Sequence, residues 1–391
     1  MNSKIILKKN EDRRVREGHL WVFSNEVEIT EDSVENGDSV DIYDSQQEFI
    51  GTGFYNKNSL IACRLLNNTA IDDFHSFIKD RIMKAYRLRH EFYPGEESYR
   101  LVFSESDFLP GLIIDKYNQT FVLQINSYGM QRNVQTIVEV LKNELNAKSI
   151  FSKNEKSFRR MEGLPEEDTI YLGSMDKEII TVGSIKYEID FEKGHKTGFY
   201  FDQRDNRIFI EKITKGKNVI DAFSNSGGFG MHAAKAGASS VKFVDSSSFA
   251  IEAAKQNCTM NNIDNNIEFI VSPVYDYFEK LLSEKQLFDV IMIDPPAFAK
   301  KFKDIPAAKK GYEKLNKISL QLINDEGYLV TSSCSYHLDK EDFLEVVSRA
   351  ATKAGKKIQL IHFNQASFDH PKLPAMNETA YLKFAVFRVI R

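Results

Sequence analysis

The chain has 391 residues, of which 42% are hydrophobic and 28% charged, and its formal net charge is −4. This length accommodates two or three domains with sizeable cores, and the absence of an apolar run of about 20 residues excludes a membrane span and indicates a soluble, cytoplasmic protein. The slightly acidic balance excludes a uniformly basic nucleic-acid-binding surface but leaves room for a local basic patch.

Residues 1–72 are predicted to form a small β-barrel-like module, because short apolar runs alternate with polar turns. Within it, segment 8–23 carries five basic residues between positions 8 and 16, followed by His19 and the only tryptophan, Trp21. Guanidinium groups beside an aromatic ring suit phosphate contact and base stacking. A solvated turn before a buried strand explains the same pattern, and the two interpretations are compatible. The candidate RNA-binding residues here are Arg13, Arg14, Arg16 and His19.

Residues 73–190 are predicted to form a small central α+β domain. Apolar residues at spacings of three and four predict a helix over 73–93 and a second over 131–145, with short strands around the second helix. The polar stretch 152–168 is expected to be a loop. A hairpin over 179–191 follows, and nothing in this domain suggests catalysis.

Residues 191–391 are predicted to form a doubly wound, mostly parallel sheet, because strands and helices alternate along them. In such a sheet, ligands bind at the carboxyl ends of the strands. The segment 194–207 precedes the sheet and holds more glycine, arginine and aromatic residues than helix capping requires. We therefore expect it to form a wall of a binding site.

A strand that ends at Ala222 leads into a glycine-rich turn and a predicted helix from Met231, which lets backbone N–H groups approach a ligand. The next strand ends on Asp245, where an acid can accept both hydroxyls of a ribose. The glycines do not follow the G-x-G-x-x-G pattern of pyrophosphate cradles. A nucleoside cofactor without a pyrophosphate fits better, and S-adenosyl-L-methionine is the common one. The alternative is an ordinary turn with no ligand.

The segment Asp294-Pro-Pro-Ala-Phe298 directly follows the strand predicted over 288–293. Proline has no N–H group, so this turn leaves carbonyl groups exposed beside a carboxylate. Such a site can hold the amino edge of a planar base while Phe298 stacks on it. The alternative is that the prolines merely end the strand.

The three cysteines stand far apart, which excludes a disulfide framework and a zinc site, so no metal is expected. Cys63 and Cys258 are interpreted as small buried hydrophobes. Cys334 follows the next predicted strand end among hydroxyls and an imidazole, with Lys300 and Lys301 expected nearby, and these groups favour a thiolate. Beside a methyl donor, a thiolate can attack C6 of a pyrimidine so that C5 accepts a methyl group.

Six motifs occur in order: Arg13-Arg14 with Gly18–Phe23, Lys196–Arg207, Asp221–Phe229, Asp294–Phe298, Ser333-Cys334-Ser335 and Asp369-His370-Pro371. Together they resemble the bacterial 23S rRNA large-subunit (cytosine-C5) methyltransferases that begin with a PUA domain, along essentially the whole chain. The resemblance implies a PUA-like RNA-binding domain over 1–72, a central α+β domain over 73–190 and a Rossmann-like class I methyltransferase domain over 191–391. It also implies a homodimer.

By position, the resemblance assigns Cys334 as the nucleophile and Asp294 as the contact to the target base. Further RNA contacts would come from Phe298, Lys300 and Lys301. The implied cofactor-binding residues are Gln203, Arg204, Asp221, Phe223, Ser224, Gly227, Gly228, Phe229, Asp245, Ser246, Ser272, Val274, Asp294 and Pro295.

Two departures from the pattern concern the adenine and the product. Related proteins place an acid near Pro273 to bind the adenine amino group, whereas here this contact would rest on Ser272 and on the backbone of Val274. Ala297 stands where other RNA cytosine-C5 methyltransferases carry a cysteine that helps to release the product. The base that removes the C5 proton is therefore not assigned.

The sequence thus predicts methylation of cytosine C5 in 23S rRNA or a large-subunit precursor, through addition of Cys334 to C6. One alternative is a methyltransferase of the same fold that acts on a base nitrogen, for which Cys334 is incidental. The other is a noncatalytic RNA-binding assembly protein with a degenerate methyltransferase fold.

Overall fold

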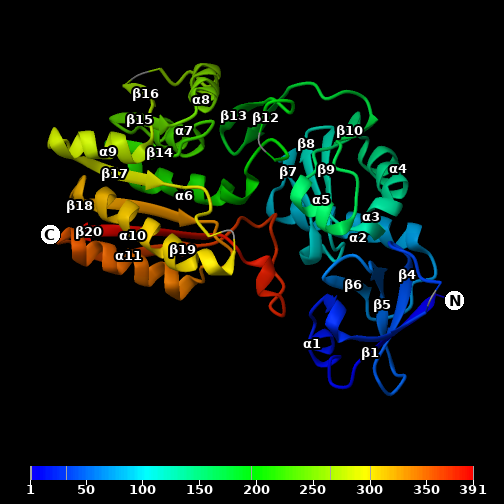
Figure 1. Cartoon of the computed structure of the whole chain (residues 1–391). Helices are drawn as coiled ribbons and strands as arrows, with labels where there is room; N and C mark the ends of the chain where they lie inside the picture. Colours follow the sequence, from blue (N-terminus) through cyan, green and yellow to red (C-terminus); the bar gives the residue numbers. More distant parts are fainter. Residues whose placement is uncertain (1, 32, 195, 265, 300, 391) are drawn as a thin grey trace. The chain divides into compact units, whose positions relative to one another are not determined.

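The computed structural model describes residues 2–390 except residues 32, 195, 265 and 300. The chain forms two compact units, coloured along the sequence in Figure 1. The first comprises Met1–Ile180, Ile189–Phe201 and Phe368–Thr379, and the second comprises Thr181–Glu188, Asp202–Ser367 and Ala380–Arg391. Each unit is therefore assembled from separate chain segments, and the division into three continuous domains at 72 and 190 stays a prediction. No helix among the described residues is long and apolar enough to cross a membrane.

The N-terminal part of the first unit is a six-stranded sheet in the order β2-β6-β5-β4-β1-β3. Its only parallel pair among the described strands is β1 with β4. Its core contains Ile5, Val22 and Ile42, all fully buried. The elements are β1 (Ser3–Leu7), α1 (Arg13–Arg16), β2 (Trp21–Phe23), η1 (Ser24–Glu26), β3 (Val27–Thr30), β4 (Ser39–Tyr43), β5 (Phe49–Tyr55) and β6 (Ile61–Asn67).

A second sheet in the first unit has the order β11-β10-β9-β8-β7. Ile82 of α2 and Leu141 of α4 belong to the same buried core as the strands. Asp73 caps α2 by accepting a hydrogen bond from the backbone N–H of Ser76 at 3.1 Å. The elements are α2 (Phe74–Phe92), β7 (Ser98–Phe103), η2 (Ser104–Asp107), β8 (Leu112–Tyr117), β9 (Thr120–Ile125), α3 (Tyr128–Arg132), α4 (Val134–Leu145), β10 (Ser149–Ser152), α5 (Lys156–Glu162) and β11 (Ile170–Leu172).

The prediction that residues 152–168 form a loop is wrong, because α5 occupies Lys156–Glu162. The inward-facing side chains of this helix are charged, so no apolar period marks it in the sequence. Arg159 is buried and donates to the carbonyl of Ile125 at 2.9 Å. Glu162 is buried and accepts from Arg64 at 2.5 Å.

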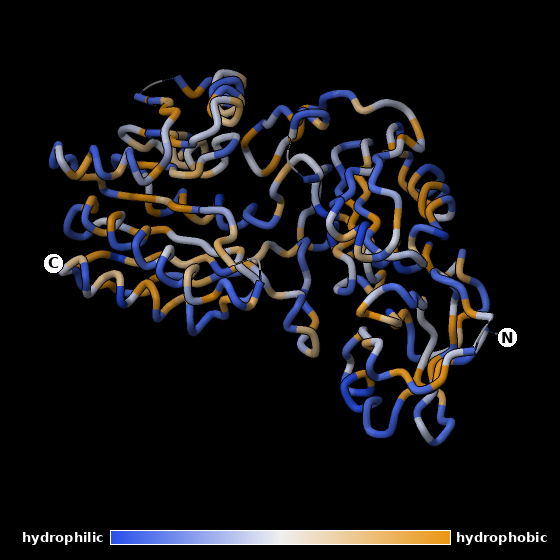
Figure 2. The backbone as a smooth tube through the Cα atoms, viewed as in Figure 1, coloured by the Kyte–Doolittle hydropathy of each residue, from blue (hydrophilic) through white to orange (hydrophobic). Residues whose placement is uncertain are grey.

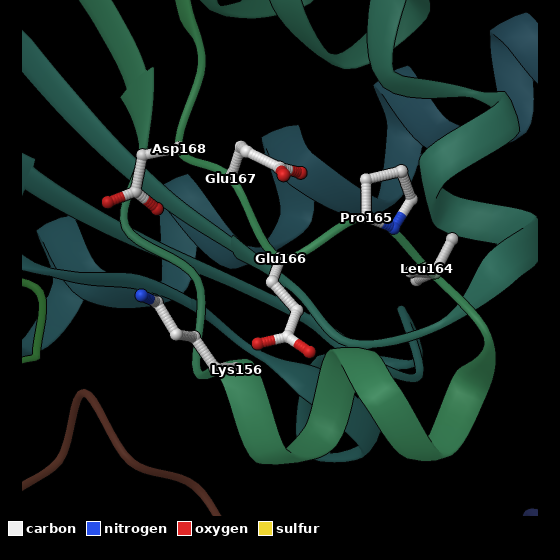
Figure 3. A pocket seen from close by; sticks show the side chains of 6 residues that line it. All are labelled: Lys156, Leu164, Pro165, Glu166, Glu167 and Asp168. Carbon is white, nitrogen blue, oxygen red and sulfur yellow. The ribbon is translucent and has the colours of Figure 1, made fainter.

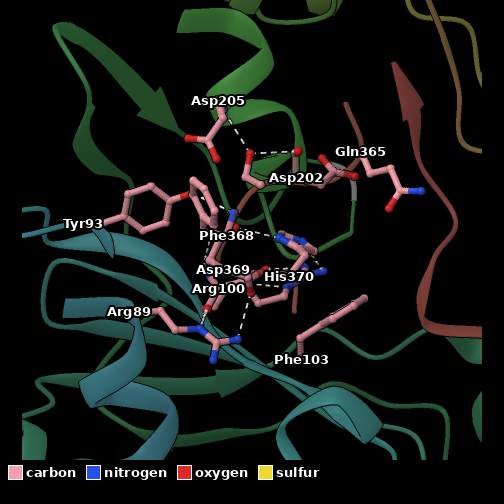
Figure 4. Close-up of polar contacts among 12 residues, drawn as sticks. Arg89, Tyr93, Arg100, Phe103, Asp202, Asp205, Gln365, Phe368, Asp369 and His370 are labelled. Carbon is pink, nitrogen blue, oxygen red and sulfur yellow. Dashed lines mark hydrogen bonds and ion pairs between the residues drawn. The ribbon is translucent and has the colours of Figure 1, made fainter. Parts of the chain in front are cut away.

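Residues 368–379 belong to the first unit, and Asp369 anchors them there. Its carboxylate accepts the backbone N–H of Arg100 at 2.9 Å and lies 2.7 Å from Nδ1 of His370 (Figure 4). Arg89 donates to the carbonyl of Asp369 at 2.8 Å and forms an ion pair with Asp107 at 2.6 Å. Asp369 and His370 are both buried, so this motif holds the segment in place.

The second unit is built on a seven-stranded sheet in the order β16-β15-β14-β17-β18-β20-β19. The pairs from β16 to β18 are parallel, and β20 is antiparallel to both of its neighbours. This is the doubly wound sheet predicted from the alternating pattern, and its strand order reverses between β14 and β17. The strands are β14 (Asn218–Ala222), β15 (Ser240–Asp245), β16 (Ile267–Val271), β17 (Phe288–Ile293), β18 (Ile323–Ser333), β19 (Lys357–Asn364) and β20 (Lys383–Ile390), besides a separate pair, β12 (Glu178–Val182) and β13 (Ile185–Ile189).

Helices cover both faces of this sheet, as Figure 1 shows, and Figure 2 shows the hydrophobic residues concentrated along its strands. One layer contains α9 (Val274–Ser283), α10 (Ile305–Gln321) and α11 (Lys340–Ala354), and the other contains α6 (Arg204–Thr214), α7 (Gly228–Lys235) and α8 (Ser248–Met260). Helix α10 begins at Ile305. Its first turns contain Pro306, Lys309 and Lys310, which hide the helical period although proline is well tolerated in a first turn.

Candidate functional site

The carboxyl ends of four neighbouring parallel strands bring the predicted site residues together. The strand register pairs Ala222 of β14 with Val244 of β15 and with Ile293 of β17, and pairs Ile293 with Thr331 of β18. The last residues of these strands and the residues that follow them therefore lie along one edge of the sheet. They include Asp221, Asp245, Asp294 and Cys334.

The turn after β14 has an unusual backbone. Phe223 and Asn225 adopt left-handed conformations, with φ of +61° and +45°. Gly227 has φ of +85°, and a Cβ atom on Gly228 would lie 2.6 Å from Nε of Arg207, so both positions require glycine. Non-glycine residues held at positive φ are uncommon and cluster at functional sites. This turn is therefore shaped for close approach of a ligand.

Asp245 fastens this turn to the end of β15. Its Oδ2 accepts the N–H of Asn225 at 3.0 Å, and its Oδ1 accepts the N–H of Ser247 at 2.9 Å. Each carboxylate oxygen has a second lone pair, so Asp245 can still accept the two hydroxyls of a ribose. Ser224 supplies a further group, since its hydroxyl is buried and has no hydrogen-bond partner among the described residues.

Asp221 lies beneath the turn and is buried. Its Oδ2 accepts the N–H of Gly230 at 2.7 Å, which fixes the first turn of α7. Burial raises the pKa of Asp221 to about 7, the Gly230 hydrogen bond opposes this shift, and the nearby charge of Asp294 adds to it. Asp221 therefore responds to charge placed at this edge of the sheet.

The remaining predicted cofactor-binding residues differ in the contacts that they could make with a ligand. Ser246 is exposed, and the backbone N–H of Ser272 donates to the carbonyl of Asp245 at 2.9 Å, so both lie beside the candidate ribose position. Phe229 and Val274 are buried in the packing of the unit, and any contact from them to a ligand would come from the backbone.

Asp294 directly follows β17, which lies between β14 and β18 in the sheet. Burial raises its pKa to about 6, and repulsion from Asp202 adds to this, whereas hydrogen bonds from Gln203 and Ser332 lower it. Gln203 lies in the same hydrogen-bonded group, because its Nε2 donates to Ser332 Oγ at 3.3 Å. Gln203 and its neighbour Arg204 are buried. A carboxyl group whose pKa is close to neutral can both give and take a proton.

Cys334 is partly exposed, and its Sγ lies 4.0 Å from the carbonyl oxygen of Pro295. The serines on either side of it are fixed by one buried tyrosine. The hydroxyl of Tyr312 lies 3.0 Å from Oγ of Ser333 and 3.0 Å from Oγ of Ser335. Helix α10 thus positions the backbone that carries the thiol. The other two cysteines, Cys63 and Cys258, are buried, and burial raises the pKa of the Cys258 thiol to about 12.

The structure places Lys383 beside Cys334, a cation that the sequence interpretation missed. Lys383 is buried, pairs in register with Ser333, and its Nζ donates to the carbonyls of Ser335 and Tyr381 at 2.7 and 2.6 Å. Burial lowers the pKa of Lys383 to about 8, and attraction to Cys334 opposes the shift. Of the two lysines predicted for this role, Lys301 is exposed to solvent, and Lys300 lies outside the described residues.

Phe298, which is predicted to stack on the target base, packs against another aromatic ring. It is partly buried, and its ring packs on Tyr312 with centroids 4.5 Å apart. A Cβ atom on Gly311 would lie 3.1 Å from the Phe298 ring, so α10 also covers it. Phe298 therefore forms part of the wall around the site.

The predicted RNA-binding arginines of the first unit face acidic residues. Arg14 donates to both carboxylate oxygens of Glu26 at 2.7 and 2.9 Å, and Arg16 pairs with Asp44 at 2.7 Å. Arg13 has 84% of its side chain exposed and pairs with Glu17, four residues along the chain, at 3.0 Å.

His19 and Trp21 are covered more than a free RNA-binding surface would be. His19 is buried, and its Nδ1 accepts the backbone N–H of Trp21 at 3.1 Å. The indole N–H of Trp21 donates to Glu105 at 2.8 Å. The partly solvated arginines and the packed aromatic residues agree with a solvated turn before a buried strand, and RNA contact by this segment stays a prediction.

A separate pocket lies in the first unit (Figure 3). It is lined by Lys156, Leu164, Pro165, Glu166, Glu167 and Asp168. Its acidic lining does not suit phosphate groups, and it contains none of the predicted site residues. Among the described residues, no group of three or more His, Cys, Asp or Glu side chains is arranged to hold a metal ion.

Known proteins resemble this chain along its whole length. Residues 5–68 match a family described as a PUA-like domain, and residues 201–357 match a family described as conserved hypothetical protein 95. The chain is 35% identical to ribosomal RNA large subunit methyltransferase I of Shewanella denitrificans and 34% identical to that of Aliivibrio fischeri, with 100% of each chain covered in both cases.

Solved structures show the same fold. One, a methyltransferase complexed with SAH, has a TM-score of 0.85 at 20% identity and covers 98% of this chain and 99% of its own. Another, a SAM-dependent methyltransferase from Streptococcus mutans, has a TM-score of 0.83 at 20% identity with the same coverage. The predicted fold class is confirmed: an α/β protein with a PUA-like N-terminal domain and a C-terminal methyltransferase domain.

Proposed function

The chain belongs to the ribosomal RNA large subunit methyltransferase I family and is an S-adenosylmethionine-dependent rRNA methyltransferase, and we propose that its product is 5-methylcytosine in 23S rRNA. The observation that carries this proposal is the position of Cys334 beside the Asp294-Pro295 turn, with a buried lysine next to it. A thiol there is placed to add to a pyrimidine ring held by Asp294.

The residues of the turn fit the cofactor. S-adenosylmethionine, when bound, supplies an electrophilic methyl group. Asp245 would accept its ribose hydroxyls, and the buried hydroxyl of Ser224 would gain a hydrogen-bond partner from the ligand. Asp221 would lie near its positive sulfonium group, which favours the ionised carboxylate at a residue whose pKa burial has raised.

We propose the following roles for the residues around the target base. The cytosine leaves its stack, and the Sγ of Cys334 forms a bond to C6 while the C5–C6 π electrons shift toward C5 and N3. Asp294, protonated below about pH 6, gives a proton to N3 and takes it back when the C5 electrons form the bond to the methyl group, and Lys383 stabilises the thiolate before attack. After C5 has accepted the methyl group, its proton leaves to a general base or water. The electrons of that C–H bond re-form C5=C6 and expel Cys334 as the thiolate.

The test is mass spectrometry of 23S rRNA fragments incubated with the protein and labelled S-adenosylmethionine. We expect the label in 5-methylcytidine, and we expect Cys334→Ala to lower turnover by about a thousandfold or more while cofactor affinity is unchanged. A matched trap uses RNA that contains 5-fluorocytidine, whose C5 carries no proton to lose. The wild-type protein should form a covalent complex that survives denaturation, and Cys334→Ala should not.

Two outcomes would overturn the proposal. Label on a base nitrogen together with an active Cys334→Ala variant would support the alternative enzyme and make Cys334 incidental. An absence of cofactor binding would support a noncatalytic RNA-binding protein. A homodimer and the substrate form, naked 23S rRNA or a large-subunit precursor, belong to the same proposal and are tested by light scattering and by labelling each substrate.

The RNA-contacting residues are also part of the proposal, and their support differs. Arg13 and Lys301 are exposed and suit phosphate contact. Arg14, Arg16 and His19 would have to leave present partners or the packed interior to reach RNA. Phe298 would contact the target base as part of the wall.

A further inference from the structure

Three aromatic rings beside Cys334 have no part in the proposed chemistry. Phe302 is 77% exposed, Tyr336 is 40% exposed and His337 is partly exposed. Phe302 lies in η4 (Phe302–Asp304), after the Asp294-Pro-Pro turn, and the other two follow Cys334 in the chain. We call these three residues the rim aromatic cluster.

The cluster is continuous although its members come from two loops. The ring centroids of Phe302 and His337 are 6.2 Å apart at an interplanar angle of 86°, and those of Tyr336 and His337 are 4.9 Å apart at 72°. The two loops leave β17 and β18, which are hydrogen-bonded neighbours, so the sheet itself sets the loops side by side. The nucleophile lies in one of these loops.

Leaving such rings in water is unfavourable for folding. A phenylalanine side chain gains about 1.5–3 kcal/mol from full burial. A single exposed ring needs no explanation, but contiguous exposed apolar groups mark interaction sites. Phe298, which the sequence suggested as the stacking residue, is already covered by α10, so Phe302 is the ring of this segment that faces solvent.

The charges around the cluster indicate the type of partner. Lys301 and Lys303 flank Phe302 in the chain and are both exposed, and Lys310 is exposed on α10. Aromatic rings interleaved with cations suit single-stranded nucleic acid, because bases stack on the rings and phosphates pair with the ammonium groups. A partner protein surface would need acidic groups at the same spacing, whereas an RNA strand carries one phosphate at every nucleotide.

We propose that the rim aromatic cluster is a stacking platform for the unpaired nucleotides that flank the target base, with Lys301 and Lys303 contacting their phosphates. This inference rests on the proposed function, because it takes the substrate at Cys334 to be an RNA base. The platform places a requirement on the RNA that the methylation reaction alone does not. The segment around the target must be single-stranded over several nucleotides, since paired bases expose no face for stacking.

The experiment compares Phe302→Ala with Phe302→Trp in the full-length protein. Fluorescence anisotropy measures affinity for a short labelled oligocytidylate and for the same strand paired with its complement. We expect Phe302→Ala to weaken binding of the single strand by about five- to a hundredfold, and Phe302→Trp to retain it. Duplex binding and cofactor affinity should not change.

Phe158→Ala is the matched control, because Phe158 is also an exposed phenylalanine, at 52%, but lies on α5 of the first unit. It should bind the single strand as the wild type does. Single-strand affinity in Phe302→Ala equal to that of the wild type would overturn the platform, as would an equal loss in Phe158→Ala.

The platform and the proposed reaction fail separately. Label found in 5-methylcytidine, together with an unchanged affinity of Phe302→Ala, would overturn the platform and leave the reaction standing. Loss of single-strand binding in Phe302→Ala, with label on another base, would support the platform and overturn the cytosine-C5 assignment.

Discussion

Two regions rich in basic residues differ in whether those residues are paired with acidic side chains. In the first unit, Arg14 and Arg16 of α1 pair with Glu26 and Asp44, which come from later parts of the chain. At the sheet edge of the second unit, Lys301 is exposed to solvent and Lys383 is buried next to the Cys334 thiol. A cluster of basic residues in a sequence therefore does not show that these residues are available to bind a ligand. Acidic residues from distant parts of the chain can pair with them in the folded protein.

Among the charged residues of these two regions, the largest effect should come from Lys383→Met, which keeps the volume of the side chain but removes its charge. We expect the turnover number to fall by about a hundredfold or more, because the thiolate of Cys334 loses its neighbouring cation. Alkylation of Cys334 by iodoacetamide should slow in parallel, while cofactor affinity is unchanged.

This pattern separates a role in tuning the thiol from a merely structural one. Equal alkylation rates in wild type and variant would show that Lys383 only holds the carbonyls of Ser335 and Tyr381. Lys383 would then have a structural role only, and its charge would not assist the Cys334 thiol.

A second prediction concerns the pH dependence of stability at Asp221. A carboxyl group in the unfolded chain titrates near pH 4, whereas burial raises the pKa of Asp221 to about 7 in the folded protein. The folded state therefore retains a proton that the unfolded state has lost. The stability from this group is complete below about pH 4 and is lost as the pH rises through about 7.

Asp221→Asn should remove this contribution, which is on the order of a few kcal/mol. The Gly230 N–H can still donate to the asparagine oxygen, so the turn should persist. Urea unfolding of the cofactor-free protein should then depend less steeply on pH than in the wild type. An unchanged slope would mean that Asp221 is already ionised in the folded state.

Arg14→Ala should affect stability more than RNA binding. Glu26 is buried and also accepts the backbone N–H of Phe23, so loss of the two hydrogen bonds from Nη2 of Arg14 should lower the free energy of unfolding by about 1–3 kcal/mol. We expect the affinity for 23S rRNA fragments to change by less than about twofold, because the charge of Arg14 is already neutralised by Glu26. A tenfold loss of RNA affinity in an Arg14→Ala variant that unfolds like the wild type would contradict this prediction, because Arg14 would then bind RNA and not stabilise the fold.

Arg13→Ala should have the smallest effect on folding, below about 0.5 kcal/mol, because its pair with Glu17 is exposed. Its accessible guanidinium makes it the arginine of α1 best placed for a phosphate. If it makes such a contact, the slope of log affinity against log salt concentration should decrease by about one. An unchanged slope would remove α1 from the RNA-binding surface.

Local patterns predicted the sheet of the second unit and the edge along which the candidate site residues lie. Parallel strands deliver their carboxyl ends to one edge, so Asp221, Asp245, Asp294 and Cys334 could be grouped from the strand ends alone. Their individual binding roles remain proposals.

Three features depended on long-range pairing or on buried polar groups. The place of Lys383 is set by the antiparallel register of β20 on β18, which no local pattern encodes. Tyr312 reads as a core residue in the sequence, yet its hydroxyl holds the serines around the thiol. Helix α5 was missed because polar side chains, such as that of Arg159, form its buried face.

The position of β20 has a consequence for synthesis of the protein. This strand follows β19 in the chain but lies between β18 and β19 in the sheet. While the ribosome is still making residues 357–382, β19 has no partner on which to pair, and the sheet stops at β18. Because Lys383 is the first residue of β20, the insertion that completes the sheet also brings the cation to Cys334. In a nascent chain, Cys334 therefore has no neighbouring Lys383 until this late, long-range strand pairing has formed.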